Sequence, residues 1–216
     1  MNFPFQKGVS VYLLAYLKST SPLSQQVEEI RARSNITERP PHLTLHAMHL
    51  NADHPRLDDI LRAMSEGFEA CYKSTLGLIQ GETRTLEVLG DPASKQYLVL
   101  DFEETPFVAN ITAFRMCIYE SIKNELGPLR QGPPNNAHPD FVYYGNLDGA
   151  VYAVQSIYRG TGRWKPHVTI CQLPNMLDAG ALVPILRPQG IDMMSDVEKL
   201  VLSPSGMRKT VVDIPL

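Results

Sequence analysis

Two short stretches of the chain repeat one pattern of residue types that could carry out acid–base chemistry. Residues 42–45 (His-Leu-Thr-Leu) and residues 167–170 (His-Val-Thr-Ile) each place a histidine two positions before a threonine, and each follows a proline. A chain with six histidines is expected to contain about 0.3 His-x-Thr triplets by chance. Two copies in the same apolar frame therefore indicate a shared role.

The alternation of polar and apolar residues predicts that each stretch is a half-buried β-strand. Side chains at i and i+2 of a strand share a face, so His42 and Thr44 point one way while the leucines between and after them point into the core. The same argument applies to His167 and Thr169. We expect the two strands to present two imidazoles and two hydroxyls to one cleft.

Such a set of groups matches what the cleavage of a phosphodiester requires. One histidine can take the proton of the attacking oxygen and the other can donate a proton to the leaving oxygen. The threonine hydroxyls can donate hydrogen bonds to the phosphoryl oxygens, where negative charge develops. This chemistry needs no metal and no cofactor, and the sequence predicts neither.

The paired His-x-Thr stretches resemble the 2H phosphoesterase superfamily, also called the LigT-like family, whose pattern is two His-hydrophobic-Ser/Thr-hydrophobic strands. The resemblance implies an acid–base pair of His42 and His167, phosphate-binding hydroxyls on Thr44 and Thr169, and a bilobal, pseudo-two-fold α+β fold. In that fold two antiparallel sheets line a central cleft and the helices lie outside.

Members of this family act on phosphodiesters that involve a ribose 2′ oxygen, and several are viral antagonists of nucleotide immune signals. The resemblance implies a phosphodiesterase for a small nucleotide or short oligonucleotide, such as 2′,5′-oligoadenylate or a cyclic nucleotide messenger. An RNA-end 2′,3′-cyclic phosphate and an ADP-ribose cyclic phosphate are the alternative substrates. A protein that binds or sequesters nucleotides without turnover is the alternative of another class.

The expected elements repeat the order strand, helix, motif strand and helix. We predict strands at 9–16, 97–102, 141–144, 151–158, 197–202 and 211–214 around the two motif strands, hairpin strands at 76–80 and 86–89 joined through Gly81, and helices at about 22–39, 55–72, 105–127 and 177–186. This order favours a single domain of two lobes over residues 1–216.

The spacing between the two motifs is longer than the family resemblance leads us to expect. The excess is assigned to an insertion around residues 127–163, which combines a loop rich in Pro, Gly and Asn with a tyrosine-rich hairpin. This insertion could be a lid or a base-stacking wall that carries Tyr143, Tyr144, Tyr152 or Tyr158. It could equally be a surface elaboration or a dimer contact.

Candidate substrate-binding residues lie next to the motifs and in the insertion. Arg39, Trp164 and Lys165 could bind a phosphate or stack on a base, and Tyr144 could add a second stacking surface. A solvated charge pair around a partly buried tryptophan explains the same residues without a ligand.

A metal site at His42, His46, His49 and His54 is a further alternative. On a helix, histidines four residues apart would share a face, but the prolines and the alternation favour a strand, on which His42 and His46 lie roughly 13 Å apart. The glutamate that a zincin places after its first histidine is Leu43 here.

Composition and charge limit the class of partner and the compartment. A net charge of −3 provides no broad basic surface for a long nucleic acid, so a small nucleotide fits better. Cys71, Cys117 and Cys171 form no Cys-x-x-Cys pair and are expected to be free thiols in a reducing compartment. Residues 9–17 are expected to form a buried strand and not a signal segment, and no apolar run reaches membrane-spanning length. We therefore predict a cytoplasmic protein.

Overall fold

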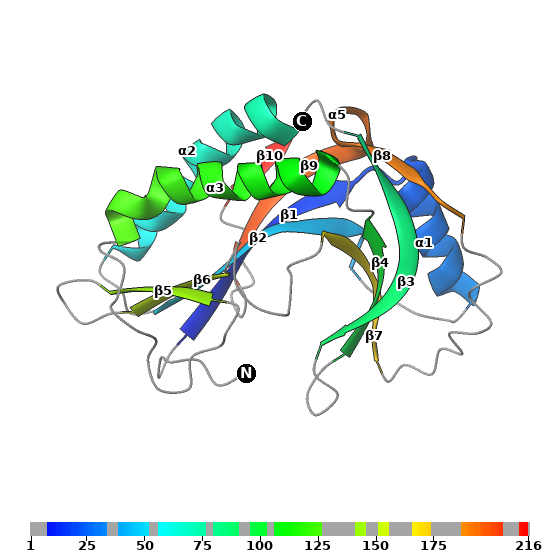
Figure 1. The fold of residues 1–216 in the computed structure, drawn as a ribbon, viewed down its shortest axis with the longest axis horizontal. Coiled ribbons are helices and arrows are strands. Elements are labelled where there is room, and N and C mark those ends of the chain that lie inside the picture. The colour runs from blue at the N-terminus through cyan, green and yellow to red at the C-terminus, as the bar shows by residue number, and fades with distance from the viewer. Residues whose placement is uncertain are drawn as a thin grey trace.

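The structure is a computed structural model, and it describes the chain in eleven stretches separated by gaps. These stretches are residues 8–33, 39–51, 56–76, 80–90, 96–102, 106–126, 141–145, 151–155, 166–173, 187–204 and 212–215. The fold is α+β: a strongly curled antiparallel sheet carries its helices on the outer side (Figure 1).

Most of the strands follow the pattern of the sequence. The strands are β1 (Gly8–Leu17), β2 (His42–Asn51), β3 (Gln80–Gly90), β4 (Gln96–Phe102), β5 (Phe141–Gly145), β6 (Val151–Gln155), β7 (His167–Leu173), β8 (Gly190–Asp192), β9 (Val197–Pro204) and β10 (Val212–Pro215). Of these, β3 is one long strand and β8 was not predicted. The motif strands are β2 and β7, and each begins at its motif histidine. Pro41 and Pro166 stand just before them, a position where a proline costs the sheet no hydrogen bond.

One continuous sheet replaces the two separate sheets that we expected. Its strand order is β10-β9-β1-β2-β7-β4-β3-β8, with the β5–β6 hairpin attached to β2 through β6, and every strand pair is antiparallel. The two motif strands meet in the middle at the single pair Leu43–Val168. The order on either side of this seam is compatible with the pseudo-two-fold relation of the resemblance, which stays a prediction because strand order alone does not define a rotation axis.

The helices of the described residues are α1 (Pro22–Arg33), α2 (Leu57–Cys71), α3 (Pro106–Leu126) and the short α5 (Met193–Asp196). Helix α1 begins as its sequence predicts, because the Ser21 hydroxyl accepts a hydrogen bond from the Ser24 amide at 3.2 Å and Pro22 occupies the first turn. Helices α2 and α3 lie side by side over one side of the sheet, and α1 packs on β7 and β8 (Figure 1).

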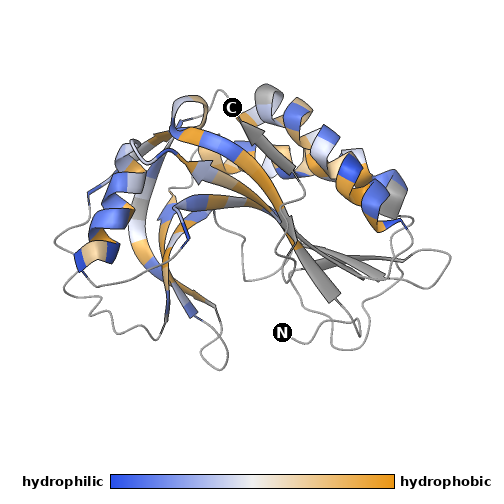
Figure 2. Cartoon of the chain, turned by 180° about the vertical axis from the view of Figure 1, so that it is seen from behind, coloured by the Kyte–Doolittle hydropathy of each residue, from blue (hydrophilic) through white to orange (hydrophobic). Residues whose placement is uncertain are grey.

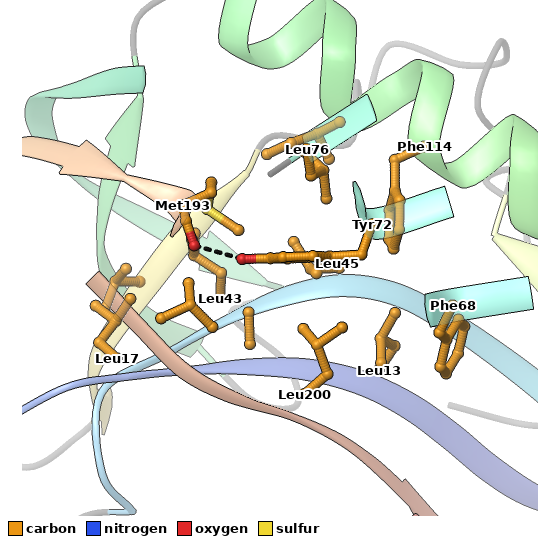
Figure 3. Packing of buried hydrophobic residues seen from close by; sticks show 14 of the residues in the cluster. Leu13, Leu17, Leu43, Leu45, Phe68, Tyr72, Leu76, Phe114, Met193 and Leu200 are labelled. Atoms are coloured by element: carbon orange, nitrogen blue, oxygen red, sulfur yellow. Dashed lines mark hydrogen bonds between the residues drawn. The ribbon is translucent and has the colours of Figure 1, made fainter. Parts of the chain in front are cut away.

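The main core fills the space between the sheet and its helices. Leu43 and Leu45 of β2 meet Tyr72, Phe114 and Met193 there, and the Tyr72 hydroxyl donates a hydrogen bond to the Met193 carbonyl (Figure 3). Hydrophobic residues concentrate on the central strands and on the helix sides that face them (Figure 2). The apolar half of each motif is therefore what anchors its strand.

The hairpin predicted around Gly81 is wrong. Residues 72–76 continue α2 as one turn of π-helix, η1 (Tyr72–Leu76), and Gly81 lies inside the long strand β3, which pairs with β4 on one side and β8 on the other. A glycine usually indicates a turn, but here a Cβ at residue 81 would lie 2.6 Å from the ring of Phe107. Gly81 is required by a close approach of α3 to the strand.

The prediction of three free thiols is also wrong. Cys71 at the end of α2 and Cys117 in α3 form a disulfide with a Cα–Cα distance of 6.0 Å, and Cys171 is a buried free cysteine. Sequence spacing concealed this pair because the packing of two helices brings together residues 46 positions apart. Two of the three cysteines from which we predicted a reducing compartment are therefore not free thiols.

Other expectations are met or lie outside the described residues. The β5–β6 hairpin forms as predicted, and the two predicted closing strands are β9 and β10, which the structure pairs with each other. The predicted helix at 177–186 and the loop of the insertion at 127–140 lie outside the described residues. Among the helices that are described, none is long and apolar enough to cross a membrane.

Candidate functional site

The four motif residues lie together at the seam of the sheet. Leu43 is paired with Val168, so the antiparallel register places His42 opposite Thr169 and Thr44 opposite His167. Leu43 and Val168 are fully buried in the main core, whereas all four motif residues are half-buried and alternate with them. The four side chains therefore share the opposite side of the sheet, which we call the motif face.

The spacing on the motif face suits a group bound between two imidazoles. Directly opposite residues of an antiparallel pair have Cβ atoms about 5 Å apart, and diagonal neighbours such as His42 and His167 lie roughly 7–8 Å apart. The charge of His167 acts on His42 electrostatically, as expected of neighbours. Each histidine therefore lies beside the threonine of the other motif.

Both motif strands carry a β-bulge at the same motif position. In β2, Leu13 pairs with His46 and Leu14 with Thr44, which leaves Leu45 as the extra residue. In β7, Leu98 pairs with Cys171 and Val99 with Thr169, which leaves Ile170 as the extra residue. The repeat in the sequence is thus also a repeat of backbone structure.

The bulge explains where the alternation predicted from the sequence ends. A bulge changes which side chains reach each face, so His46, two residues after Thr44, is fully buried and lies near Arg115 of α3. Neither ring nitrogen of His46 has a hydrogen-bond partner within the described part of the chain. Burial, with a smaller contribution from Arg115, lowers the pKa of His46 to about 3.

This arrangement separates the histidines of the metal alternative. His42 lies on the motif face and His46 in the core, the side chain of His49 is not described, and His54 lies outside the described residues. Within the stretches that the structure describes, no group of three or more His, Cys, Asp or Glu is arranged to hold a metal ion.

The two motif histidines have different cross-strand neighbours. On the β1 side, Tyr16 pairs with His42, and the two rings have centroids 5.3 Å apart at 45°. The next residue in that row is Lys199 of β9, whose Nζ lies 6.0 Å from the centre of the Tyr16 ring. On the β4 side, Asp101 pairs with His167. His42 therefore has a phenol beside it, whereas the residue paired with His167 carries a carboxylate.

The local contacts of His42 determine its tautomer. Its Nδ1 lies 2.8 Å from the Pro40 carbonyl oxygen, which can only accept a hydrogen bond, so Nδ1 carries the proton and Nε2 has the lone pair. Burial lowers the pKa of His42, and the charges of Arg39, Arg31 and His167 act in the same direction, while the bond to Pro40 opposes them. His42 is thereby favoured as a neutral base.

Arg31 connects the two motif segments from behind the site. It is 2% exposed, and its guanidinium donates to the Thr169 carbonyl at 3.0 Å, the Ile170 carbonyl at 2.9 Å and the Arg39 carbonyl at 2.8 Å. Its Nη1 also contacts Glu28 at 2.7 Å. Arg31 thus supports the bulge of β7 and the segment that leads into β2.

Sequence reasoning missed Tyr16, Arg31 and Asp101. Nothing in the local pattern of α1 distinguishes Arg31 from Arg33, because the partners of Arg31 in β7 lie more than 130 positions away in the chain. The sequence does contain a signal for Asp101, since it is the one charged residue of β4 and interrupts the apolar run of residues 97–102. A carboxylate in such a strand needs a buried partner.

The predicted substrate-binding residues have different outcomes. Arg39 is exposed and precedes His42 by three residues, and its positive charge acts on His42. Trp164 and Lys165 lie outside the described residues, and Tyr144 is placed only as a backbone position of β5, paired with Tyr152. The β5–β6 hairpin extends the sheet beside the later part of β2, where β6 pairs at Met48 and His49.

Two cavities lined by described residues lie away from the motif face. One, of about 450 Å³, lies between β3, β8 and α5 next to Glu82, Asp192 and Asp196, and the other, of about 420 Å³, lies beside α1 next to Gln26 and Arg187. Neither is lined by a motif residue.

Comparison with known proteins gives structural neighbours only. No protein-family model and no curated protein matches the sequence. Among solved structures, Kluyveromyces marxianus Usb1 matches with a TM-score of 0.46 and 11% identity over 96% of this chain and 98% of that one. The same protein with uridine monophosphate matches with a TM-score of 0.42 and 11% identity over the same shares. Because both TM-scores lie below 0.5, the chemistry of the site is inferred from the geometry of this chain alone.

Proposed function

We propose that the protein is a phosphodiesterase that cleaves a 2′-linked phosphodiester in a small nucleotide or short oligonucleotide. The observation that supports this proposal is the register of the seam, because pairing of Leu43 with Val168 brings the two His-x-Thr motifs together on one face of the sheet. In an antiparallel pair the backbones of diagonal residues lie roughly 7–8 Å apart, so a phosphate bound between His42 and His167 is within reach of both side chains.

In the proposed mechanism His42 is the base and His167 is the acid. Nε2 of His42 takes the proton of the attacking hydroxyl or water, since its Nδ1 proton is held by the Pro40 carbonyl. His167 donates its proton to the leaving oxygen as the phosphorus–oxygen bond breaks. The hydroxyls of Thr44 and Thr169 donate hydrogen bonds to the non-bridging oxygens. The protons balance without a metal or a cofactor.

A small substrate fits the distribution of charge. The chain has a net charge of −3, and among the described residues the cations near His42 are Arg39 and the buried Arg31, with Lys199 two strands away on β9. That set can neutralise one or two phosphates and not a long backbone. We favour 2′,5′-oligoadenylate or a cyclic nucleotide messenger as the substrate.

The test is a turnover panel in EDTA, read by chromatography. The panel contains 2′,5′-oligoadenylate, cyclic dinucleotides with 2′ linkages, 2′,3′-cyclic mononucleotides and ADP-ribose 1″,2″-cyclic phosphate. We expect turnover of a 2′-linked substrate and a loss of roughly 10²–10⁴-fold in His42→Ala and in His167→Ala. The matched control is Thr112→Val, which removes a hydroxyl of α3 that bonds the Val108 carbonyl and should leave turnover unchanged.

Three outcomes contradict this proposal. Cleavage of 3′,5′ linkages alone would overturn the linkage, and loss of turnover in EDTA that added metal restores would overturn the two-histidine mechanism. Tight binding without turnover by the intact protein would instead identify a nucleotide-sequestering module. Melting temperatures of both histidine variants must match that of the wild type, so that lost activity cannot come from unfolding.

A further inference from the structure

We propose that Asp101 is the positioning residue of His167: its carboxylate orients the His167 imidazolium and makes His167 the proton donor of the reaction. The assignment rests on the proposed function for its catalytic meaning. Its structural part, the coupling of the carboxylate to one imidazole, can be measured without any substrate.

The register places the two side chains together. Asp101 of β4 is paired with His167 of β7, and opposite residues of an antiparallel pair share a face with Cβ atoms about 5 Å apart. At that separation a carboxylate stabilises an imidazolium and can accept its N–H.

Burial and hydrogen bonds fix the Asp101 carboxylate. Asp101 is 6% exposed, and its Oδ1 accepts hydrogen bonds from the amide and the hydroxyl of Thr85, both at 2.9 Å. Both bonds go to one oxygen, so the orientation of the carboxylate is set while Oδ2 keeps its capacity to accept another N–H. A buried carboxylate in an apolar strand is costly without a cationic partner, and a protonated His167 would supply one.

The equivalent place beside His42 holds a different group. Tyr16 pairs with His42 in β1 just as Asp101 pairs with His167 in β4. A phenol gives an imidazolium no compensating charge, and Arg39 and Arg31 disfavour a proton on His42. The cross-strand neighbours therefore distinguish the two histidines: Tyr16 leaves His42 as the base, and Asp101 makes His167 the acid.

Among the residues that the structure describes, the charged groups on the elements packed against His167 play other roles. Strand β7 is packed by β4, β2 and α1. Strand β2 contributes His42, whose own positive charge would oppose a proton on His167, and α1 contributes Arg31, which bonds the β7 backbone and carries Glu28 with it. Glu87 of β3 is paired with Val99, which is itself paired with Thr169 and not with His167.

The first experiment is an NMR titration of the histidine rings without substrate. In the wild type we expect a higher pKa for His167 than for His42. In Asp101→Asn, which keeps the size of the side chain, the pKa of His167 should fall by about 1–3 while that of His42 changes little. Glu87→Gln is the matched control and should leave the pKa of His167 where it is.

The second experiment is the pH dependence of kcat/KM for the same proteins. An acid must be protonated, so activity is lost as the pH rises through the pKa of His167. In Asp101→Asn this alkaline limb should move to lower pH while the acid limb stays in place, and Asp101→Glu should restore part of the difference. A purely structural role of Asp101 would lower the rate at all pH values and move neither limb.

The outcomes separate the two proposals. An unchanged pKa of His167 in a folded Asp101→Asn protein would overturn the assignment of Asp101, even if the enzyme cleaves its substrate. If that variant does not fold, the wild-type titration decides, because a pKa of His167 at or below that of His42 would overturn the assignment as well. A wild type that turns over no substrate in the panel would refute the proposed function but leave the measured coupling intact.

Discussion

At the scale of single residues, the buried Arg31 is the group whose importance is least visible in the sequence. Its guanidinium donates to three backbone carbonyls. Two of them, those of Thr169 and Ile170, lie at the bulge of β7, and the third is that of Arg39. A planar fork of donors is suited to such an arrangement, which an ammonium group could satisfy only in part.

We expect Arg31→Met to lower the free energy of unfolding by about 2–5 kcal/mol, because it leaves buried carbonyls without a donor. Arg31→Lys should recover part of that loss. Arg33→Met is the matched control on the same helix, since Arg33 is exposed and pairs with the exposed Glu29, and its effect should stay within about 0.5 kcal/mol. Chemical denaturation gives all three values, and equal effects of the Arg31 and Arg33 variants would contradict the role of Arg31.

The motif residues are the part of the site that could be predicted from sequence, because they lie close together in the chain and repeat. His42 and Thr44 reach the motif face as the alternation requires, and so do His167 and Thr169. Their neighbours Tyr16 and Asp101 could not be predicted in the same way. The partner of a residue across a sheet depends on which strands pair and in which register.

At the scale of elements, the bulge in β2 lies next to the buried His46, and the burial of this histidine makes the stability of the fold depend on pH. His46 is buried with a pKa of about 3, whereas in the unfolded chain its pKa is near the ordinary 6.5. Between these values the unfolded state binds a proton that the folded state does not. Stability therefore falls as the pH decreases below about 6.5, by roughly 1.4 kcal/mol for each pH unit.

We expect His46→Leu to remove this part of the acid sensitivity. Denaturation at pH 7.5 and pH 5.0 should show a smaller loss in the variant than in the wild type, by roughly 2 kcal/mol. The variant should also be at least as stable as the wild type at pH 7.5, because leucine leaves no ring nitrogen unsatisfied. Parallel losses in the two proteins would show that His46 is not the group responsible.

The pair of helices α2 and α3 carries the disulfide that the sequence pattern did not predict. We expect the denatured, unreduced protein to show one reactive thiol per chain, that of Cys171, and the reduced protein to show three. Cys71→Ser combined with Cys117→Ser should cost about 2–4 kcal/mol of stability, with the same loss on adding reductant to the wild type. Three reactive thiols before reduction would contradict the bond.

At the scale of the whole molecule, helices from each half of the chain pack against strands from the other. Helix α1 follows β1 yet packs on β7 and β8, where Gln26 donates a hydrogen bond to the Arg187 carbonyl at 3.1 Å. Helix α3 follows β4 yet packs on α2 and contacts β2. The burial of α1 and of α3 therefore depends in part on elements that are distant from them in the chain.

Because α1 and α3 pack on elements that are distant in the chain, we expect the protein to unfold in a single cooperative transition. The slowest amide protons of β1 and β4, which lie on opposite sides of the seam, should exchange with the same free energy of opening. Hydrogen exchange followed by NMR or mass spectrometry measures both. Clearly different values for the two strands would show that the halves unfold independently, and the narrow β2–β7 seam would then be a boundary.

The sequence by itself determined the two motif strands, most of the helices and strands, and the residue types available for chemistry, because these depend on local spacing and alternation. Only the tertiary structure decided that Leu43 pairs with Val168, that Asp101 pairs with His167, that Arg31 reaches both motif segments and that Cys71 meets Cys117. These contacts join residues distant in the chain, and the register and packing that create them are set by the burial of the whole core and not by any one segment.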